Sequence, residues 1–287
     1  YGPWGDTEAP HPTAKGEFLL DEQICVSCHQ AEARYPDQNL GCFFSTGAEW
    51  SESRWAEQGV SCQGCHMPQV ERKVAEHFDV PPRKTRRHWF GGSLIPKKPA
   101  FADEIAALEP IYGSGVTLEV LAVPEGLAPA PLREPPLESA PEVVGCAGEE
   151  PCRRVLVRVR NDRAGHYMPS GDPERHLEIV AEATDTASGR VLGRAYDLIG
   201  SRYKWWPTIE LLEDTRIPPG EHRDLWVEVP GQGPFSLEVR ARKQRMYPEA
   251  FEHHELAGEY VRGRCFHLSR WRVDAQGRPA LEHIEDD

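Results

Sequence analysis

The sequence lacks any run of about 18 apolar residues, the length that a membrane-spanning helix needs, and it therefore predicts no integral membrane segment. It also lacks an excess of positive charge. Its formal net charge is −13 at pH 7, which argues against double-stranded nucleic acid as a partner. The chain begins at Tyr1 without a methionine or an apolar leader, so we expect a processed or trimmed chain whose signal peptide is not visible.

Two five-residue segments share one pattern: "CVSCH" occupies Cys25 to His29, and "CQGCH" occupies Cys62 to His66. C-x-x-C-H is the attachment signature of c-type haem, in which both thiols bind the porphyrin and the histidine is the proximal iron ligand. With 8 Cys and 12 His in 287 residues, about 0.01 accidental matches are expected. The sequence thus predicts two haem c groups, attached through Cys25, Cys28, Cys62 and Cys65 and ligated by His29 and His66.

The same four cysteines allow two other interpretations. A four-cysteine zinc site has no use for a histidine after each pair, and the loop between the pairs is longer than the usual zinc-ribbon spacing. A redox dithiol does not need the histidines either. Haem attachment is the interpretation that uses all six residues.

Four cysteines lie outside the motifs, and this even number fits an oxidising compartment outside the cytoplasm. Cys146 and Cys152 lie in "GCAGEEPC", a short polar segment that could close a local disulfide. Cys42 and Cys265 would then be left to pair across domains. Four cysteines allow three pairings, and four buried free thiols are the alternative.

One stretch departs from the overall acidity. Only Glu71, Glu76 and Asp79 oppose its basic residues, which surround His88. We expect it to neutralise haem propionates or to dock an acidic redox partner, with a solvated basic face as the alternative. Its basic members are Arg72, Lys73, Arg83, Lys84, Arg86, Arg87, Lys97 and Lys98.

A chain of 287 residues has room for two domains. The expected fold class is α+β: a small, loop-rich, mostly helical dihaem domain over residues 1–113, followed by a β-sandwich domain over 114–287. In "EWSESRWAEQGVSCQGCH", Trp50, Trp55 and Ala56 share a helical face, and Gly59 ends that helix. Residues 79–100 are rich in proline and glycine and predict a loop, and residues 102–111 predict a short helix.

From Gly115 onward the pattern changes to alternating apolar and polar residues, which predicts strands. "DTASGRVLG" predicts a hairpin with Gly189 in its turn. Residues 124–153 form a long connection, and the chain beyond the last expected strand is a helix or an extended arm at the C-terminus. The expected strands are 116–123, 154–161, 176–185, 223–230 and 235–242.

The distal ligand of each iron decides function, because axial ligands can move a haem potential over about 0.8 V. His88 stands beside two glycines in "RRHWFGG", and His166 stands in the glycine-flanked loop "AGHYMPSG". Both are candidate distal ligands, and His11 and His77 are weaker candidates. Met67 follows His66 directly and cannot reach the opposite face of the same iron.

These segments resemble bacterial multihaem cytochromes c of the cytochrome c554-like group. The resemblance covers "ICVSCHQ", "EWSESRWAEQGVSCQGCHMPQ" and "RRHWFGG" over residues 20–95, and "NDRAGHYMPSGDPER" within 155–180. It implies electron transfer in the periplasm or outside the cell, with His88 and then His166 as iron ligands. Relatives often have a histidine in the helix before the second haem, where this chain has Arg54 and Trp55, so that family ligand is absent.

The leading hypothesis is a dihaem carrier that transfers electrons between redox partner proteins outside the cytoplasm, rather than a catalyst. One alternative is a haem enzyme with an open iron position, acting on peroxide or on a small nitrogen or sulfur compound. Another is a subunit of a cytochrome filament or complex, in which other multihaem cytochromes or copies of the chain are the partners. The spin state of the iron separates the first two hypotheses.

Overall fold

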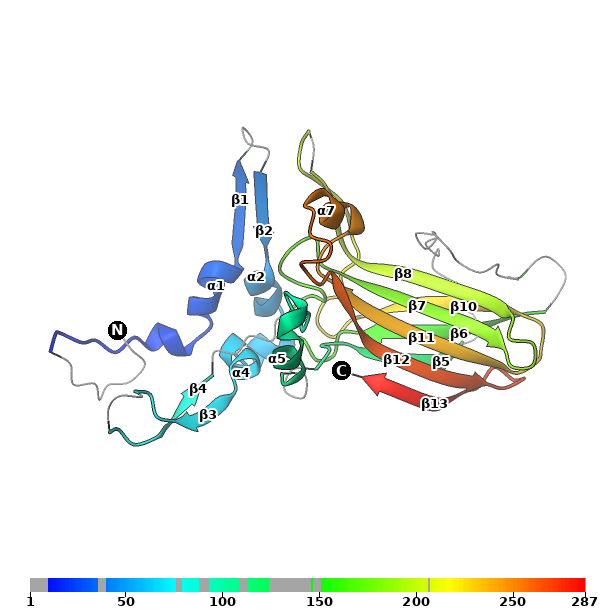
Figure 1. The fold of residues 1–287 in the computed structure, drawn as a ribbon, viewed down its shortest axis with the longest axis horizontal. Helices are drawn as coiled ribbons and strands as arrows, with labels where there is room; N and C mark the ends of the chain where they lie inside the picture. Colours follow the sequence, from blue (N-terminus) through cyan, green and yellow to red (C-terminus); the bar gives the residue numbers. More distant parts are fainter. Residues whose placement is uncertain are drawn as a thin grey trace.

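The computed structural model describes residues 10–35, 40–75, 79–87, 93–108, 113–123, 146, 151–205 and 207–286. The haem motifs lie in a group of small elements at one end of the molecule, and two β-sheets form the other end (Figure 1). Within these described ranges, no helix has both the length and the apolar character needed to cross a membrane.

The part that carries the haem motifs consists of very short elements. Its longest helix has seven residues, and each of its two hairpins pairs strands of four or five residues. In chain order the elements are η1 Glu17–Leu20, α1 Gln23–His29, β1 Ala31–Tyr35, β2 Leu40–Phe44, α2 Thr46–Ser51, α3 Arg54–Glu57, α4 Cys62–His66, β3 Gln69–Arg72, β4 Arg83–Arg86, η3 Pro99–Phe101 and α5 Ala102–Ala106.

The expectation of a mostly helical haem domain is wrong. More of the described residues lie in strands than in helices, and the haem-motif part itself contains the β1–β2 and β3–β4 hairpins. The helix expected before the second motif is divided into α2 and α3, because the buried Ser53 interrupts it in an extended conformation. Gly59, with φ +70°, ends this region as expected. Helices of four to seven residues are too short to be stable alone, so packing must hold them.

The β part contains two sheets that pack face to face. One has three strands in the order β10-β6-β5, and the other has six in the order β13-β12-β11-β7-β8-β9. All neighbouring strands in these sheets are antiparallel. The strands are β5 Thr117–Ala122, β6 Cys152–Arg160, β7 His176–Asp185, β8 Val191–Lys204, β9 Glu210–Asp214, β10 His222–Pro230, β11 Phe235–Gln244, β12 Gly263–Val273 and β13 Pro279–Asp286, with helix α7 Pro248–His253 between β11 and β12.

The hydrophobic core lies between these two sheets. Alternate residues of β6 and β10 face alternate residues of β7 and β11, as the period of two in their sequences requires. Many of these side chains are fully removed from solvent. The inward-facing set includes Val155, Val157, Val159, Leu225, Val227, Val229, Ile179, Ala181, Ala183, Phe235, Leu237 and Val239.

All five expected strands are confirmed, as is the hairpin at Gly189, which has φ +73° between β7 and β8. The alternation did not predict β9, β12 and β13, or most of β8. Register shifts interrupt the pairing of β7 with β8, β11 with β12 and β12 with β13. Each shift inserts an extra residue and so disturbs the alternation that identifies a strand in sequence.

The expected local disulfide between Cys146 and Cys152 is present, with an S–S distance of 2.06 Å. It fastens the chain before β6 to the first residue of that strand. Cys265 is a free, exposed thiol. The suggested Cys42–Cys265 pair is therefore not formed in this structure; the side chain of Cys42 lies outside the described residues.

Candidate haem site

Each C-x-x-C-H motif forms its own short helix, α1 or α4. The two cysteines of a motif are three residues apart, which places them on the same side of a helical turn, and the histidine follows at once. All four motif cysteines are free thiols, and Cys28 and Cys65 are exposed to solvent. Both motifs therefore present their reactive groups in the order that covalent attachment of a haem requires.

The two motifs approach one another at the first cysteine of each. The thiols of Cys25 and Cys62 are close enough for each to change the pKa of the other. Gln63, a spacer residue of the second motif, is buried and donates from Nε2 to the carbonyl oxygen of Asp21, just before α1. Two attachment sites that are 37 residues apart in sequence are thus adjacent in space.

The β3–β4 hairpin secures the end of α4. Arg86 Nη1 donates to the carbonyl oxygens of Gln63 at 2.8 Å and Met67 at 3.1 Å. Helix C-termini leave carbonyl groups unsatisfied, and a guanidinium is a suitable partner for them. This contact holds the helix that ends at His66.

The geometry does not favour a four-cysteine zinc site. Among the described residues, the only group of three or more Cys, His, Asp or Glu ligand atoms within 4.8 Å of one another is Cys146, Cys152 and Glu228. Its two sulfurs are joined in the disulfide, and it includes none of the motif cysteines. A tetrahedral zinc site would need all four motif sulfurs together.

Burial changes the acid–base properties of the motif side chains. Burial raises the pKa of the Cys62 thiol to about 11, with a further contribution from Cys25. Burial likewise raises the pKa of the Cys25 thiol. A thioether carries no charge, so it tolerates this desolvated position better than a thiolate does.

His66 faces His166, which belongs to the loop between β6 and β7. Their ring centres are 6.2 Å apart and their planes differ by 14°. Both side chains are half-buried. Burial lowers the pKa of His66, and the nearby His166 and His29 lower it further. The chain thus brings together two imidazoles that lie 100 positions apart in the sequence.

The spacing of this pair fits a haem iron. Imidazoles whose ligating nitrogens point at one iron from opposite sides have ring centres about 6.2 Å apart, since an iron–nitrogen bond is about 2 Å and the nitrogen lies about 1.1 Å from its ring centre. In addition, His166 Nδ1 lies 2.9 Å from the carbonyl oxygen of Tyr167, so Nε2 is the nitrogen left for a metal. Metal-ligating histidines commonly use their other nitrogen in this way.

The loop that carries His166 packs closely on α2 and α3. A Cβ atom at Gly165 would lie 3.2 Å from Trp55 Cδ1 and 3.3 Å from Trp50 Cδ1. Trp50 is itself fixed by a hydrogen bond from Nε1 to the carbonyl oxygen of Val60 at 3.0 Å, and Arg54 Nη2 donates to the Asp162 carbonyl oxygen at 3.1 Å. The absence of a side chain at position 165 therefore permits the approach of the two parts.

We expect Gly165→Val to destabilise the protein by about 1–3 kcal/mol, because the added carbons overlap the two indole rings. Thermal unfolding followed by circular dichroism measures this change. Gly233→Ala is the matched control, since a Cβ there meets no heavy atom within 4 Å. Equal unfolding midpoints for the two variants would contradict the close packing of this loop.

The other candidate histidines are exposed or lie outside the described residues. His29 is exposed at the end of α1, and His11 is exposed with Nδ1 3.2 Å from the carbonyl oxygen of Pro12. His88 and His77 lie outside the described residues. Within the described ranges, His66 and His166 are the candidate axial histidines whose rings lie nearly parallel at 6.2 Å.

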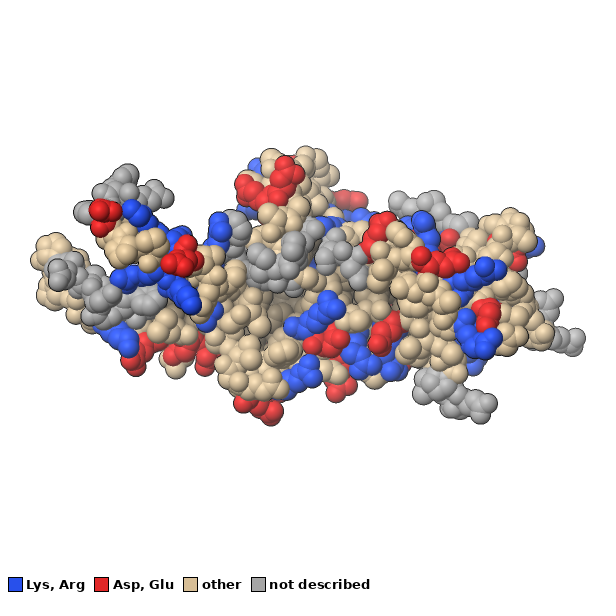
Figure 2. Space-filling model, turned by 90° about the horizontal axis from the view of Figure 1, so that it is seen from below, with Lys and Arg blue, Asp and Glu red and all other residues tan. Residues whose placement is uncertain are grey.

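Members of the basic segment have several different partners. Arg86 binds α4, Lys73 pairs with Asp79 at 3.4 Å, and Lys98 pairs with Glu259 at 2.7 Å and lies over the Tyr260 ring. At the end of the molecule where β3 and β4 lie, Lys and Arg side chains are interspersed with Asp and Glu (Figure 2). Whether this end docks a partner stays a prediction.

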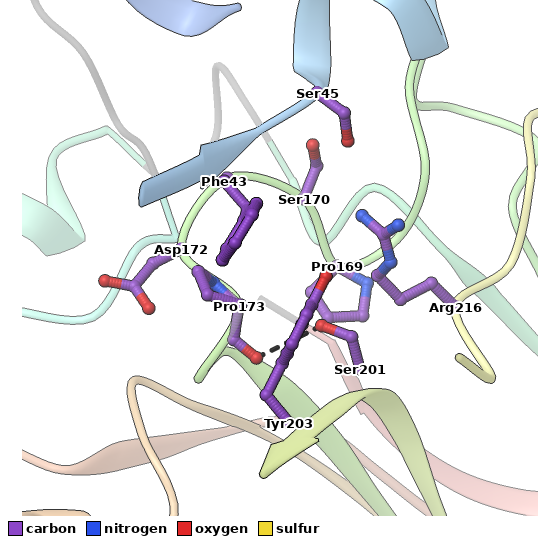
Figure 3. Close-up of a pocket in the computed structure, with 10 residues that line it drawn as sticks. Phe43, Ser45, Pro169, Ser170, Asp172, Pro173, Ser201, Tyr203 and Arg216 are labelled. Carbon is purple, nitrogen blue, oxygen red and sulfur yellow. Dashed lines mark hydrogen bonds between the residues drawn. The ribbon is translucent and has the colours of Figure 1, made fainter. Parts of the chain in front are cut away.

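A small polar pocket lies beside the His166 loop. Residues 169–173 form one wall, and Phe43 and Tyr203, whose rings stack at 5.5 Å, form another (Figure 3). Ser45, Ser170 and Arg216 line the same pocket. Sequence reasoning missed Arg216 and its partner Glu49, because nothing local in an acidic or basic residue signals an ion pair across 167 positions.

Comparison with solved structures places the chain in a fold class: it has the fold of part of a multihaem cytochrome c. The matching structure is a penta-heme cytochrome c552 from Thermochromatium tepidum, with 21% sequence identity and a TM-score of 0.53. The match covers 96% of this chain and 57% of the cytochrome, so the chain spans little more than half of that protein's length.

A second match, to the ASH/PapD-like domain 7 of human CEP192, has 10% identity and a TM-score of 0.18. It covers 49% of this chain and 77% of that domain, and the superposition is too poor to bear on the fold. No model of a known protein family matches the sequence, and no curated protein does.

Proposed function

We propose that the protein is a dihaem c-type cytochrome that transfers electrons between redox partner proteins outside the cytoplasm. The observation that carries the proposal is the adjacency of two C-x-x-C-H helices, one of whose histidines faces a second imidazole at 6.2 Å. That spacing matches axial ligation on both sides of an iron. The shared fold with a penta-heme cytochrome supports the same assignment.

The residues divide into attachment, proximal and distal roles. Cys25 and Cys28 hold the first haem, Cys62 and Cys65 hold the second, and His29 and His66 are the proximal ligands. We assign His166 as the distal ligand opposite His66. His88 is the candidate distal ligand opposite His29, and His11 and His77 are weaker candidates for that position. Bound haem would supply a reversible one-electron couple, and two imidazole ligands favour a low potential.

The chain's own residues set the conditions for this transfer. The contact between Cys25 and Cys62 keeps the two attachment sites adjacent, which shortens the path between the haems. The apolar side chains of Trp50 and Trp55 lie next to the His166 loop and exclude water from that side of the site. The division at residues 113–114 then separates a part that attaches both haems from a β-sandwich that supplies one ligand.

Mass spectrometry of the matured, intact protein tests the assignment. We expect the mass of the polypeptide plus two haem groups, and one haem fewer in the Cys62→Ser/Cys65→Ser double variant. Cys265→Ser is the control, because that thiol is free but lies outside both motifs. A polypeptide mass without added haem would remove the proposal. Optical spectra then separate the carrier, with purely low-spin bands, from the enzyme alternative, with a high-spin iron.

A further inference from the structure

Glu49 is a buried carboxylate at the junction of the haem-motif part and the β-sandwich. It lies in α2, its exposed fraction is 6%, and both of its oxygens accept hydrogen bonds. Oε1 accepts from Ser45 Oγ at 2.5 Å and from Arg216 Nη1 at 2.7 Å. Oε2 accepts from Ser170 Oγ at 2.6 Å and from the backbone N–H of Tyr167 at 3.2 Å. Three of these four donors belong to the β part.

The charge of Glu49 is balanced by Arg216. Arg216 Nη2 also donates to Asp214 Oδ2 at 2.7 Å, and its guanidinium lies 5.2 Å from the centre of the Tyr167 ring. Burial acts to lower the pKa of Arg216, but Asp214 and Glu49 outweigh it and raise that pKa. Removing one member of a buried ion pair is costly because the other charge is left without a partner.

These contacts hold the backbone that directly follows His166. Asn161 Nδ2 donates to the carbonyl oxygen of His166 at 2.8 Å, and Glu49 accepts from the next N–H, that of Tyr167. Ser170, four residues after His166, is held by Glu49 and by Thr46 Oγ1 at 2.8 Å. A ligand loop fixed in this way keeps its imidazole in place before the metal binds.

We propose that Glu49 is the positioning residue of the His166 ligand: its carboxylate fastens the 167–170 loop to α2 and so holds the His166 ring opposite His66. The inference rests on the proposed function, since it concerns the distal ligand of that iron. Glu49 does not contact the haem itself in this role. It acts through the backbone of Tyr167 and through Ser170.

Glutamine cannot replace this carboxylate. An amide has one acceptor oxygen and one donor nitrogen. In either orientation of the amide, the NH2 group therefore faces a group that can only donate a hydrogen bond. One orientation opposes Arg216, and the other opposes the Tyr167 N–H. We therefore expect Glu49→Gln to fill the same space but to release the loop.

The test compares haem-loaded wild type, Glu49→Gln, Ser170→Ala and His166→Ala, with Glu57→Gln on the exposed surface of α3 as the control. The probe is carbon monoxide added to the reduced protein, because it binds only iron whose distal ligand has left. We expect the rate of uptake to rise about tenfold or more in Glu49→Gln, and less in Ser170→Ala, which loses one of the four contacts. The control keeps the wild-type rate.

Two patterns of results are decisive. Uptake in Glu49→Gln at the wild-type rate, while His166→Ala binds carbon monoxide readily, would overturn the positioning role and leave the ligand assignment intact. Unchanged uptake in His166→Ala would show that His166 is not the ligand, so the assignment in the proposed function fails first. If Glu49→Gln does not fold, the Ser170→Ala variant decides. Faster carbon monoxide uptake in Ser170→Ala, which added imidazole returns to the wild-type rate, supports the positioning role. Uptake in Ser170→Ala at the wild-type rate contradicts it.

Discussion

His166→Ala is expected to convert one of the two irons from a six-coordinate low-spin state to a five-coordinate high-spin state. The other described histidine near His66 is His29, which the proposed function assigns to the first haem, so we expect no described side chain to replace the lost imidazole. The midpoint potential of that haem should rise, because loss of an imidazole ligand destabilises the oxidised iron. Optical spectra of the oxidised protein and a redox titration measure the two effects.

The matched control for this variant is His253→Ala. His253 and His254 are exposed at the end of α7, and their rings contact each other edge to face. We expect that control to keep both low-spin bands and both potentials. Identical spectra for His166→Ala and wild type would show that the 6.2 Å pairing of His66 with His166 does not reflect ligation.

Phe235→Ala should lower the free energy of unfolding of the β part by about 3–5 kcal/mol, since it removes a large buried ring and leaves a cavity. Phe235 is the first residue of β11, its exposed fraction is 0%, and the guanidinium of Arg153 lies 5.0 Å from its ring centre. Urea unfolding followed by far-ultraviolet circular dichroism measures the loss. Phe101→Ala, with an exposed fraction of 42%, is the control and should change stability little.

The same unfolding experiment tests how the two parts are linked. Because His166 belongs to the β part and His66 to the haem-motif part, unfolding of the sandwich withdraws the distal imidazole. We therefore expect the low-spin band of one haem to disappear at the same urea concentration as the circular dichroism signal of the β part. Both transitions should occur at a lower urea concentration in Phe235→Ala than in wild type. A low-spin band that survives unfolding of the sheets would place the distal ligand outside the sandwich.

Local sequence patterns predicted those parts of the protein whose chemistry is local. The attachment signature needs only five consecutive residues, so both motifs were recognisable without a fold. The strands β5, β6, β7, β10 and β11 were recognisable because each has one face in the core and one toward solvent. The pair Cys146 and Cys152 is only six residues apart, and the disulfide between them is present.

Where a pattern was interrupted, prediction failed. Short helices around the haem motifs led to the expectation of a helical domain, but the β1–β2 and β3–β4 hairpins lie in the same region. Strands such as β12 carry register shifts and partly exposed residues, so their alternation is weak. Tertiary packing against neighbouring strands, rather than intrinsic propensity, gives these segments their conformation.

The sequence by itself determined that this chain carries two haem attachment motifs and an extended antiparallel β region. Both signals are local: each motif needs five consecutive residues, and the alternation of apolar and polar side chains is visible within one strand. Only the tertiary structure decided which histidine faces His66 and how its loop is held. The His66–His166 pairing and the Glu49–Arg216 ion pair join residues 100 and 167 positions apart. Contacts at such separations depend on how sheets and helices pack, and no local pattern specifies that packing.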